Sequence, residues 1–215
     1  MLFQYIIIDI MNILHFIIVF LQVTGSISLV IVGTSQTRSN GKINKAILFT
    51  IAGFIVAIYL AINERIFYLL WGLSGEMTIL IFMVRHVLIY IIPNVIFLIT
   101  FGALFLFLGI KNKQNFGKYL RYSGIFWIVF GVIAIAATSI LLFTPYFGGF
   151  SIQLYLTGLY MIPIASIFMV TASVFFMIYA GKLDIKILLY SSIFLLVASS
   201  IFAVNSLLQL IMFYL

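Results

Sequence analysis

The residues best suited to chemistry lie in the segment 71–77, which reads WGLSGEM. Ser74 lies between two glycines, and a serine hydroxyl becomes a useful nucleophile only when a neighbouring base accepts its proton. The chain has only two histidines, His15 and His86, and Glu76 is the nearest carboxylate to Ser74. We therefore treat Ser74, Glu76 and His86 as one candidate site on an outer segment of the protein.

Gly72-Leu73-Ser74-Gly75 resembles the Gly-x-Ser-Gly motif that carries the nucleophile of rhomboid-type intramembrane proteases. The resemblance covers four residues, and it implies a six-helix core with a catalytic histidine on a later helix. No histidine follows His86, and the Gly-rich motif that surrounds the rhomboid histidine is also missing. We expect the glycines to form a turn, and an intramembrane serine hydrolase using Ser74 is kept only as a remote alternative.

The same shortage of ligands limits the cofactors that the chain could bind. A bis-histidine haem would need both His15 and His86, and no spacing argument brings the two together. Zinc or copper needs more ligands than two histidines and scattered carboxylates provide. The absence of cysteine excludes iron–sulfur clusters and thiolate zinc sites. We therefore expect no catalytic residues, no cofactor and no metal.

Polar residues are concentrated in the first apolar segment, residues 4–33. His15, Gln22 and Ser26 fall within about 40° of one another on a helical wheel, with Asn12 and Asp9 beside them. Ionisable residues inside a membrane are functional candidates by default. We interpret this stripe as an interaction surface or a cavity lining, made of Asp9, Asn12, His15, Gln22 and Ser26. Asn205 and Gln209 form a second polar pair, expected to hydrogen-bond between helices.

Membrane-spanning helices must position these residues. The chain of 215 residues is 66% hydrophobic and 7% charged, with a mean hydropathy of +1.35. An average protein has about 25% charged residues, and about 20 apolar residues cross a bilayer core. We expect an all-α integral membrane protein, a single transmembrane domain over 1–215 without a soluble domain. Its six helices would lie at 4–33, 46–62, 87–110, 122–144, 153–180 and 187–213.

Basic residues predict the orientation of these helices. The linkers 35–45, 111–121 and 181–186 hold nine of the eleven lysines and arginines. If all three linkers are cytoplasmic, the positive-inside rule is satisfied and both termini lie outside the cell membrane. The net charge of +7 is then expected to meet the lipid bilayer and its anionic headgroups, not nucleic acid.

The apolar stretch 66–84 is predicted not to span. A seventh span would move the linker 111–121 to the outer side, against the charge rule. We expect a re-entrant or interfacial outer segment, which must be buried in protein or line a wet cavity.

Two halves of the chain resemble each other. KYLRYSGIFWIVFGVI at 118–133 and KILLYSSIFLLVASSI at 186–201 share eight of sixteen residues at an offset of 68. This predicts a duplicated hairpin, over about 87–144 and 153–213. Small residues also recur at every seventh position, which favours close helix packing. They are Gly102, Gly109, Gly124, Gly131, Thr138, Gly158, Ala165, Ala172, Ser192, Ser199 and Ser206.

Three functions compete on this basis. The first is a non-catalytic accessory subunit of a larger membrane complex, with a respiratory complex as one option. It would pack against other membrane subunits through the polar first helix and the small residues. The second is a small-solute or ion transporter or channel, favoured by the parallel repeat and by the paired Pro93 and Pro163. The third is the serine hydrolase.

Overall fold

The protein is all-helical throughout the part that the computed structural model describes. The described residues are 100–111, 116–144, 152–183 and 185–214, together with scattered positions between Ile6 and Ile27. Four helices are defined: α5 (Thr100–Lys111), α6 (Gly117–Phe143), α7 (Ile152–Lys182) and α8 (Lys186–Tyr214). No strand occurs among these residues, so the expected all-α class is confirmed for them.

Three of these helices are long and apolar enough to cross a membrane. They cover Gly117–Leu141, Ile152–Lys182 and Lys186–Tyr214, and the shorter apolar helix Phe101–Lys111 precedes them. They correspond to the last three of the six expected spans. The expected helix at 46–62 and the segment 66–84 lie outside the described residues, as does most of 4–33. Of the expected helix at 87–110, residues 87–99 lie outside them and the remainder belongs to α5.

The helices extend further into the basic linkers than the sequence predicted. Lys118 and Arg121 belong to α6, Lys182 is the last residue of α7, and Lys186 is the first residue of α8. Lysine and arginine are good helix formers, and their long aliphatic stems carry the charge away from the apolar part of the helix. The linkers are therefore shorter than expected, and the cations are exposed on helix ends.

Pro163 lies inside α7, about three turns after the helix begins at Ile152. A proline can occupy the first turn of a helix or interrupt its interior, and the position of Pro163 is interior. Proline has no backbone N–H, so the carbonyl of Leu159, four residues earlier, has no partner in the helical ladder. Membrane helices tolerate this when side chains or water supply the missing donor.

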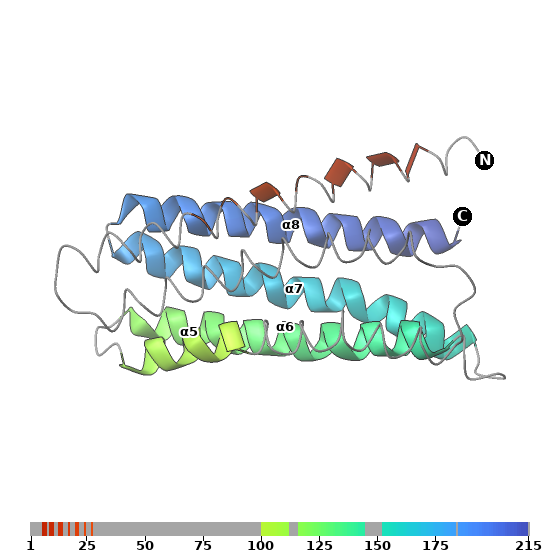
Figure 1. The fold of residues 1–215 in the computed structure, drawn as a ribbon, viewed down its shortest axis with the longest axis horizontal. Helices are drawn as coiled ribbons and strands as arrows, with labels where there is room; N and C mark the ends of the chain where they lie inside the picture. Colours follow the sequence, from red (N-terminus) through yellow and green to blue (C-terminus); the bar gives the residue numbers. More distant parts are fainter. Residues whose placement is uncertain are drawn as a thin grey trace, which may run out of the picture.

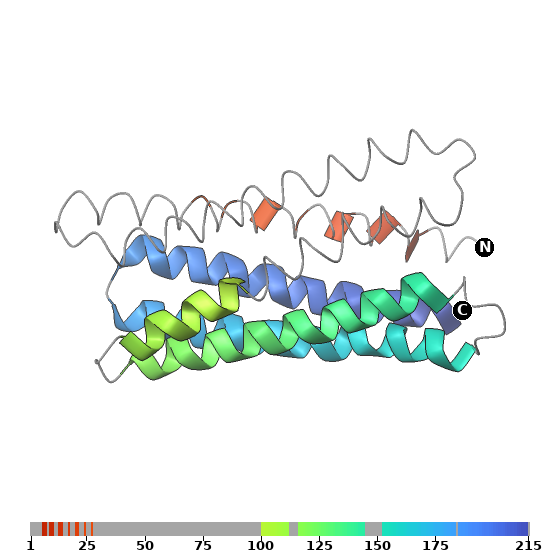
Figure 2. The same ribbon diagram turned by 60° about the horizontal axis from the view of Figure 1, so that its bottom comes forward.

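The described helices pack in chain order, α5 on α6, α6 on α7 and α7 on α8. Figure 1 shows α7 between the α5–α6 pair and α8, with all four helices aligned along one axis. In Figure 2, α5 lies along the first part of α6. Both views place the described positions of the N-terminal segment beside α8. The ends at which α5 meets α6 and α7 meets α8 lie at the same end of the bundle.

Glycines bring α5 and α6 into backbone contact. A Cβ placed on Gly124 would lie 2.5 Å from the amide nitrogen of Leu106 and 2.6 Å from the carbonyl oxygen of Gly102. A Cβ on Gly109 would lie 2.6 Å from the amide nitrogen of Arg121. The predicted close packing at these small residues is thus confirmed, and the partner is a helix of the same chain.

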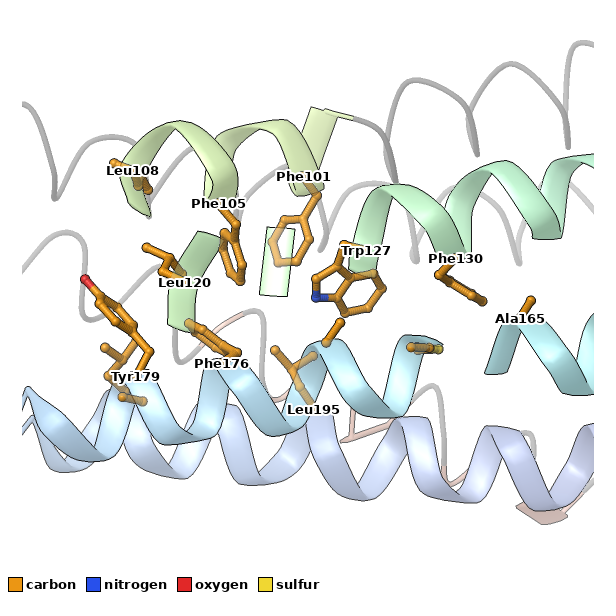
Figure 3. Close-up of a cluster of buried hydrophobic side chains, with 14 residues drawn as sticks. Phe101, Phe105, Leu108, Leu120, Trp127, Phe130, Ala165, Phe176, Tyr179 and Leu195 are labelled. Carbon is orange, nitrogen blue, oxygen red and sulfur yellow. The ribbon is translucent and has the colours of Figure 1, made fainter. Parts of the chain in front are cut away.

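Aromatic side chains fill the space between α5, α6 and α7 (Figure 3). The ring centroids of Phe105 and Phe176 lie 4.8 Å apart, and Phe101 meets Trp127 edge-on at 5.3 Å. Phe130 extends this core to α8 through Phe202, at 6.2 Å. These ring contacts join the short α5 to both α6 and α7.

Substitution of Gly124 by alanine should destabilise the bundle. The added methyl group would meet backbone atoms of α5 that cannot move aside without separating the helices, at a cost of about 1–3 kcal/mol for overpacking. Gly181→Ala is the matched control, because the nearest atom to its Cβ is Leu189 Cδ1 at 3.9 Å. Thermal unfolding in detergent should show a lower midpoint for Gly124→Ala only. Equal midpoints for both variants would contradict the backbone contact.

Candidate functional site

Most residues singled out in the sequence lie outside the described part of the chain. This holds for Ser74, Glu76 and His86 of the outer segment, and for four residues of the first-helix stripe, Asn12, His15, Gln22 and Ser26. Asp9 is described, and it is an exposed helical residue. Of the second polar pair, Asn205 is buried and Gln209 is exposed, so the structure separates two residues that the sequence grouped together.

A row of buried serines runs through the helix interfaces, which we call the serine seam. Each side chain is at most 3% exposed. Seven-residue spacing brings two of them to one face of α7 and three to one face of α8, because seven residues make about two turns. The seam consists of Ser123 on α6, Ser166 and Ser173 on α7, and Ser191, Ser192, Ser199 and Ser206 on α8.

Two hydrogen bonds of the serine seam join different helices. Ser123 Oγ donates to the carbonyl oxygen of Ala172 at 2.8 Å, which ties α6 to α7. Ser199 Oγ lies 3.0 Å from Ser173 Oγ, which ties α7 to α8. Ser173 Oγ also donates to the carbonyl of Met169 in its own helix. Hydrogen bonds of this kind contribute about 0.6 kcal/mol each on average in membrane proteins.

Asn205 lies next to the last serine of the seam, and its side chain is only 6% exposed. Its amide oxygen Oδ1 is buried and accepts no hydrogen bond from the described residues. A buried polar atom without a partner costs about 1–3 kcal/mol. Beside the seam, Asn205 is therefore the described residue whose buried oxygen still requires a hydrogen-bond donor.

The register of the antiparallel α7 and α8 places Asn205 at the level of the proline. Ser199 meets Ser173, and Tyr155 meets Phe213 at 5.6 Å. Counting from either contact with equal rise in both helices puts Asn205 opposite the turn 163–167. That turn contains Pro163 and Ser166, and Ser166 Oγ donates to the Pro163 carbonyl at 2.6 Å. The unpaired Asn205 oxygen and the Leu159 carbonyl freed by Pro163 thus occur within neighbouring turns of the bundle.

Near Asn205 this arrangement offers hydrogen-bond acceptors. Six of the seam hydroxyls donate to carbonyl or hydroxyl oxygens, so their protons are already engaged. They belong to Ser123, Ser166, Ser173, Ser192, Ser199 and Ser206. Asn205 Oδ1 accepts no hydrogen bond from the described residues, and Pro163 deprives the Leu159 carbonyl of its ladder partner. Such acceptors would attract a water, an N–H or O–H group, or a cation. Among the described residues, no three His, Asp or Glu side chains are grouped closely enough to hold a metal ion.

Sequence reasoning found the small-residue spacing but missed the serine seam as a hydrogen-bonded unit. The signal was present, since Ser192, Ser199 and Ser206 repeat every seven residues and Ser166 and Ser173 do the same.

Comparison with known proteins identifies no matching family model, no similar curated protein and no similar solved structure.

Substitution of Asn205 by leucine should raise the stability of the purified protein. Leucine has the same branched shape as asparagine and removes the unpaired oxygen, so up to about 1–3 kcal/mol of burial cost is relieved. Gln209→Leu, one turn later on an exposed position, is the matched control and should leave the unfolding midpoint unchanged. A lower midpoint for Asn205→Leu would reveal a hydrogen-bond partner and contradict this assignment.

Proposed function

We propose that the chain is a non-catalytic structural subunit of a larger membrane protein complex. The observation that carries this proposal is the exposed carboxylate of Asp9 among exposed isoleucines. The flanking Ile6, Ile10 and Ile13 are between 44% and 60% exposed. An exposed acid with isoleucines on both sides suits a protein partner better than it suits lipid, because a charge inside the membrane needs a polar partner.

The small residues of the described helices limit which surface of the chain could bind a partner subunit. Gly102, Gly124 and Gly158 contact neighbouring helices within the chain, and the serine seam links α6, α7 and α8. These surfaces are occupied internally, so they do not serve a partner as the sequence suggested. The partner surface is therefore assigned to the polar first helix around Asp9.

Substitution of Asp9 by asparagine should weaken the complex in native membranes. Loss of a charge-assisted hydrogen bond of about 1.5–3 kcal/mol would lower partner affinity at least tenfold. The measurement is purification in mild detergent with mass spectrometry of the co-purified subunits. Ser200→Ala, an exposed position on α8 whose hydroxyl bonds its own helix, is the control and should retain the partners.

The same purification tests the proposal as a whole. A fixed stoichiometry with other subunits would support an accessory role, and haem bands in the visible spectrum would identify a respiratory assembly. A homogeneous species of this chain alone would contradict it. Unchanged co-purification of Asp9→Asn would place Asp9 among hydrated headgroups instead.

We also infer that the full chain contains six spanning helices and a duplicated hairpin. Burial at the offset of 68 residues supports the duplication, because buried positions on α6 coincide with buried positions on α8. The pairs are Leu120 and Leu188, Ser123 and Ser191, and Trp127 and Leu195. Placement of the basic helix ends on the cytoplasmic side, with both termini outside, follows from the positive-inside rule.

A second candidate function is transport of a small solute or an ion. Asn205, with its unpaired oxygen at the level of Pro163, favours it, because transporters build substrate sites where interrupted helices leave main-chain carbonyls free. The site would then lie between α7 and α8, and α7 would change conformation around the proline.

Transport predicts a functional loss in the same variant that gains stability. The protein is reconstituted in vesicles, and proton or sodium gradients are followed with fluorescent dyes. Asn205→Leu should lower flux at least tenfold, whereas Gln209→Leu should retain it. Flux that never exceeds that of empty vesicles would remove the transport candidate and leave the structural role.

A further inference from the structure

An aromatic surface joins α6 and α7 below the basic end of the bundle, which we call the aromatic ladder. Phe175 is its centre, because three rings of α6 meet it. The centroid separations from Phe175 are 5.4 Å to Tyr122, 5.6 Å to Phe126 and 6.5 Å to Tyr119. Phe168 continues the ladder, at 6.1 Å from Phe126.

The ladder is accessible from outside the bundle. Tyr122 is 46% exposed, and the other four rings are half-buried, in contrast to the core rings of Phe105 and Phe176. Exposed isoleucines at positions 125, 164 and 167 flank it. Because α6 and α7 are long and apolar enough to cross a membrane, lipid chains are the surroundings that this surface would meet.

Two lysines lie at the end of the ladder nearest the basic end of the bundle. Lys118 lies on the same helical stripe as Tyr122 and Phe126, and its Nζ is 5.3 Å from the centroid of the Tyr119 ring. Lys182 follows Phe168 and Phe175 at seven-residue spacing, so it lies on the same face of α7. Both side chains are exposed.

The charge at this end of the bundle is strongly positive. The two connecting stretches 111–121 and 181–186 contain six basic residues and one acid, Asp184. Lys111, Arg121 and Lys186 are exposed there as well. The pattern complements a phosphate, and a cytoplasmic leaflet containing anionic lipid supplies phosphates at this depth.

The length of the ladder matches one lipid leaflet. Lys118 and Phe126 are eight residues apart on α6, which is about 12 Å along the helix axis. Half of a hydrocarbon core of about 30 Å is close to this value. A headgroup at Lys118 and Lys182 would therefore place an acyl chain along Tyr122, Phe126, Phe168 and Phe175.

We propose that the α6–α7 surface binds an anionic phospholipid. Lys118 and Lys182 hold its phosphate, the hydroxyl of the exposed Tyr122 lies within the headgroup region, and the aromatic ladder packs against one acyl chain. The two lysines should prefer an anionic lipid over a zwitterionic one. In a phosphocholine headgroup the choline cation already lies next to the phosphate and offsets its charge. This inference does not depend on the proposed role in a complex.

The test is native mass spectrometry of the full chain with added phosphatidylglycerol or phosphatidylcholine. The double variant Lys118→Gln with Lys182→Gln should lower the affinity for phosphatidylglycerol roughly thirtyfold, at about 1 kcal/mol for each lysine near a membrane surface. Phosphatidylcholine binding should stay unchanged. The matched control is Lys111→Gln with Lys186→Gln, which removes the same charge at the same end and should lower the affinity less than threefold.

A second measurement locates the bound lipid. Phosphatidylglycerol with a photoactivatable diazirine in its acyl chain should label peptides containing 122–126 and 168–175, and the labelling should disappear in the first double variant. Equal losses in both double variants, no loss in either, or labelling spread evenly over α8 would each overturn the site and leave only general attraction of a basic protein to anionic lipid.

Discussion

Backbone contact between α5 and α6 is the constraint on which much of the described structure depends. In a membrane, lipid tails are as apolar as leucine side chains, so helices associate through close packing and hydrogen bonds more than through the hydrophobic effect. At Gly102 and Gly124 the two helices touch main chain to main chain. This contact fixes how far Phe101 and Phe105 project, and therefore where Trp127 and Phe176 can pack against them. A wider spacing would leave these rings without partners on one side.

The serine seam satisfies polar groups within the same closely packed helices. A hydroxyl is small enough to fit between closely packed helices, and it carries one proton that must find an acceptor where water is scarce. Ser123 finds the carbonyl of Ala172, and Ser199 finds Ser173. Asn205 is larger and has two hydrogen-bonding ends, so the same packed environment leaves its oxygen without a described partner. The seam serines therefore stabilise the contacts between helices, whereas Asn205 beside them could bind a hydrogen-bond donor.

Sequence reasoning predicted the helices well where hydrophobicity and length sufficed, as for α7 and α8. It also predicted that Gly124, Ser199 and their heptad neighbours would pack closely, because small residues at seven-residue spacing have few other uses in a membrane helix. It failed to separate Asn205 from Gln209, since residues four apart share a helical stripe and only the packing shows where the buried face ends. The hydrogen-bond acceptor of Ser123 could not be predicted either, because every residue of a neighbouring helix has a main-chain carbonyl that could accept the bond.

The packing of each described helix on its neighbour in the chain bears on biogenesis. Chains are synthesised from the N-terminus, and units that pack mainly on their sequence neighbours can assemble as they emerge. The connection between α7 and α8 is only a few residues long, so the two helices can enter the bilayer as one preformed hairpin. Within this hairpin the Ser173–Ser199 contact sets the register before any distant segment is required. The order of assembly in the membrane would then follow the order of synthesis, and α8 would complete a surface that α6 and α7 had already begun.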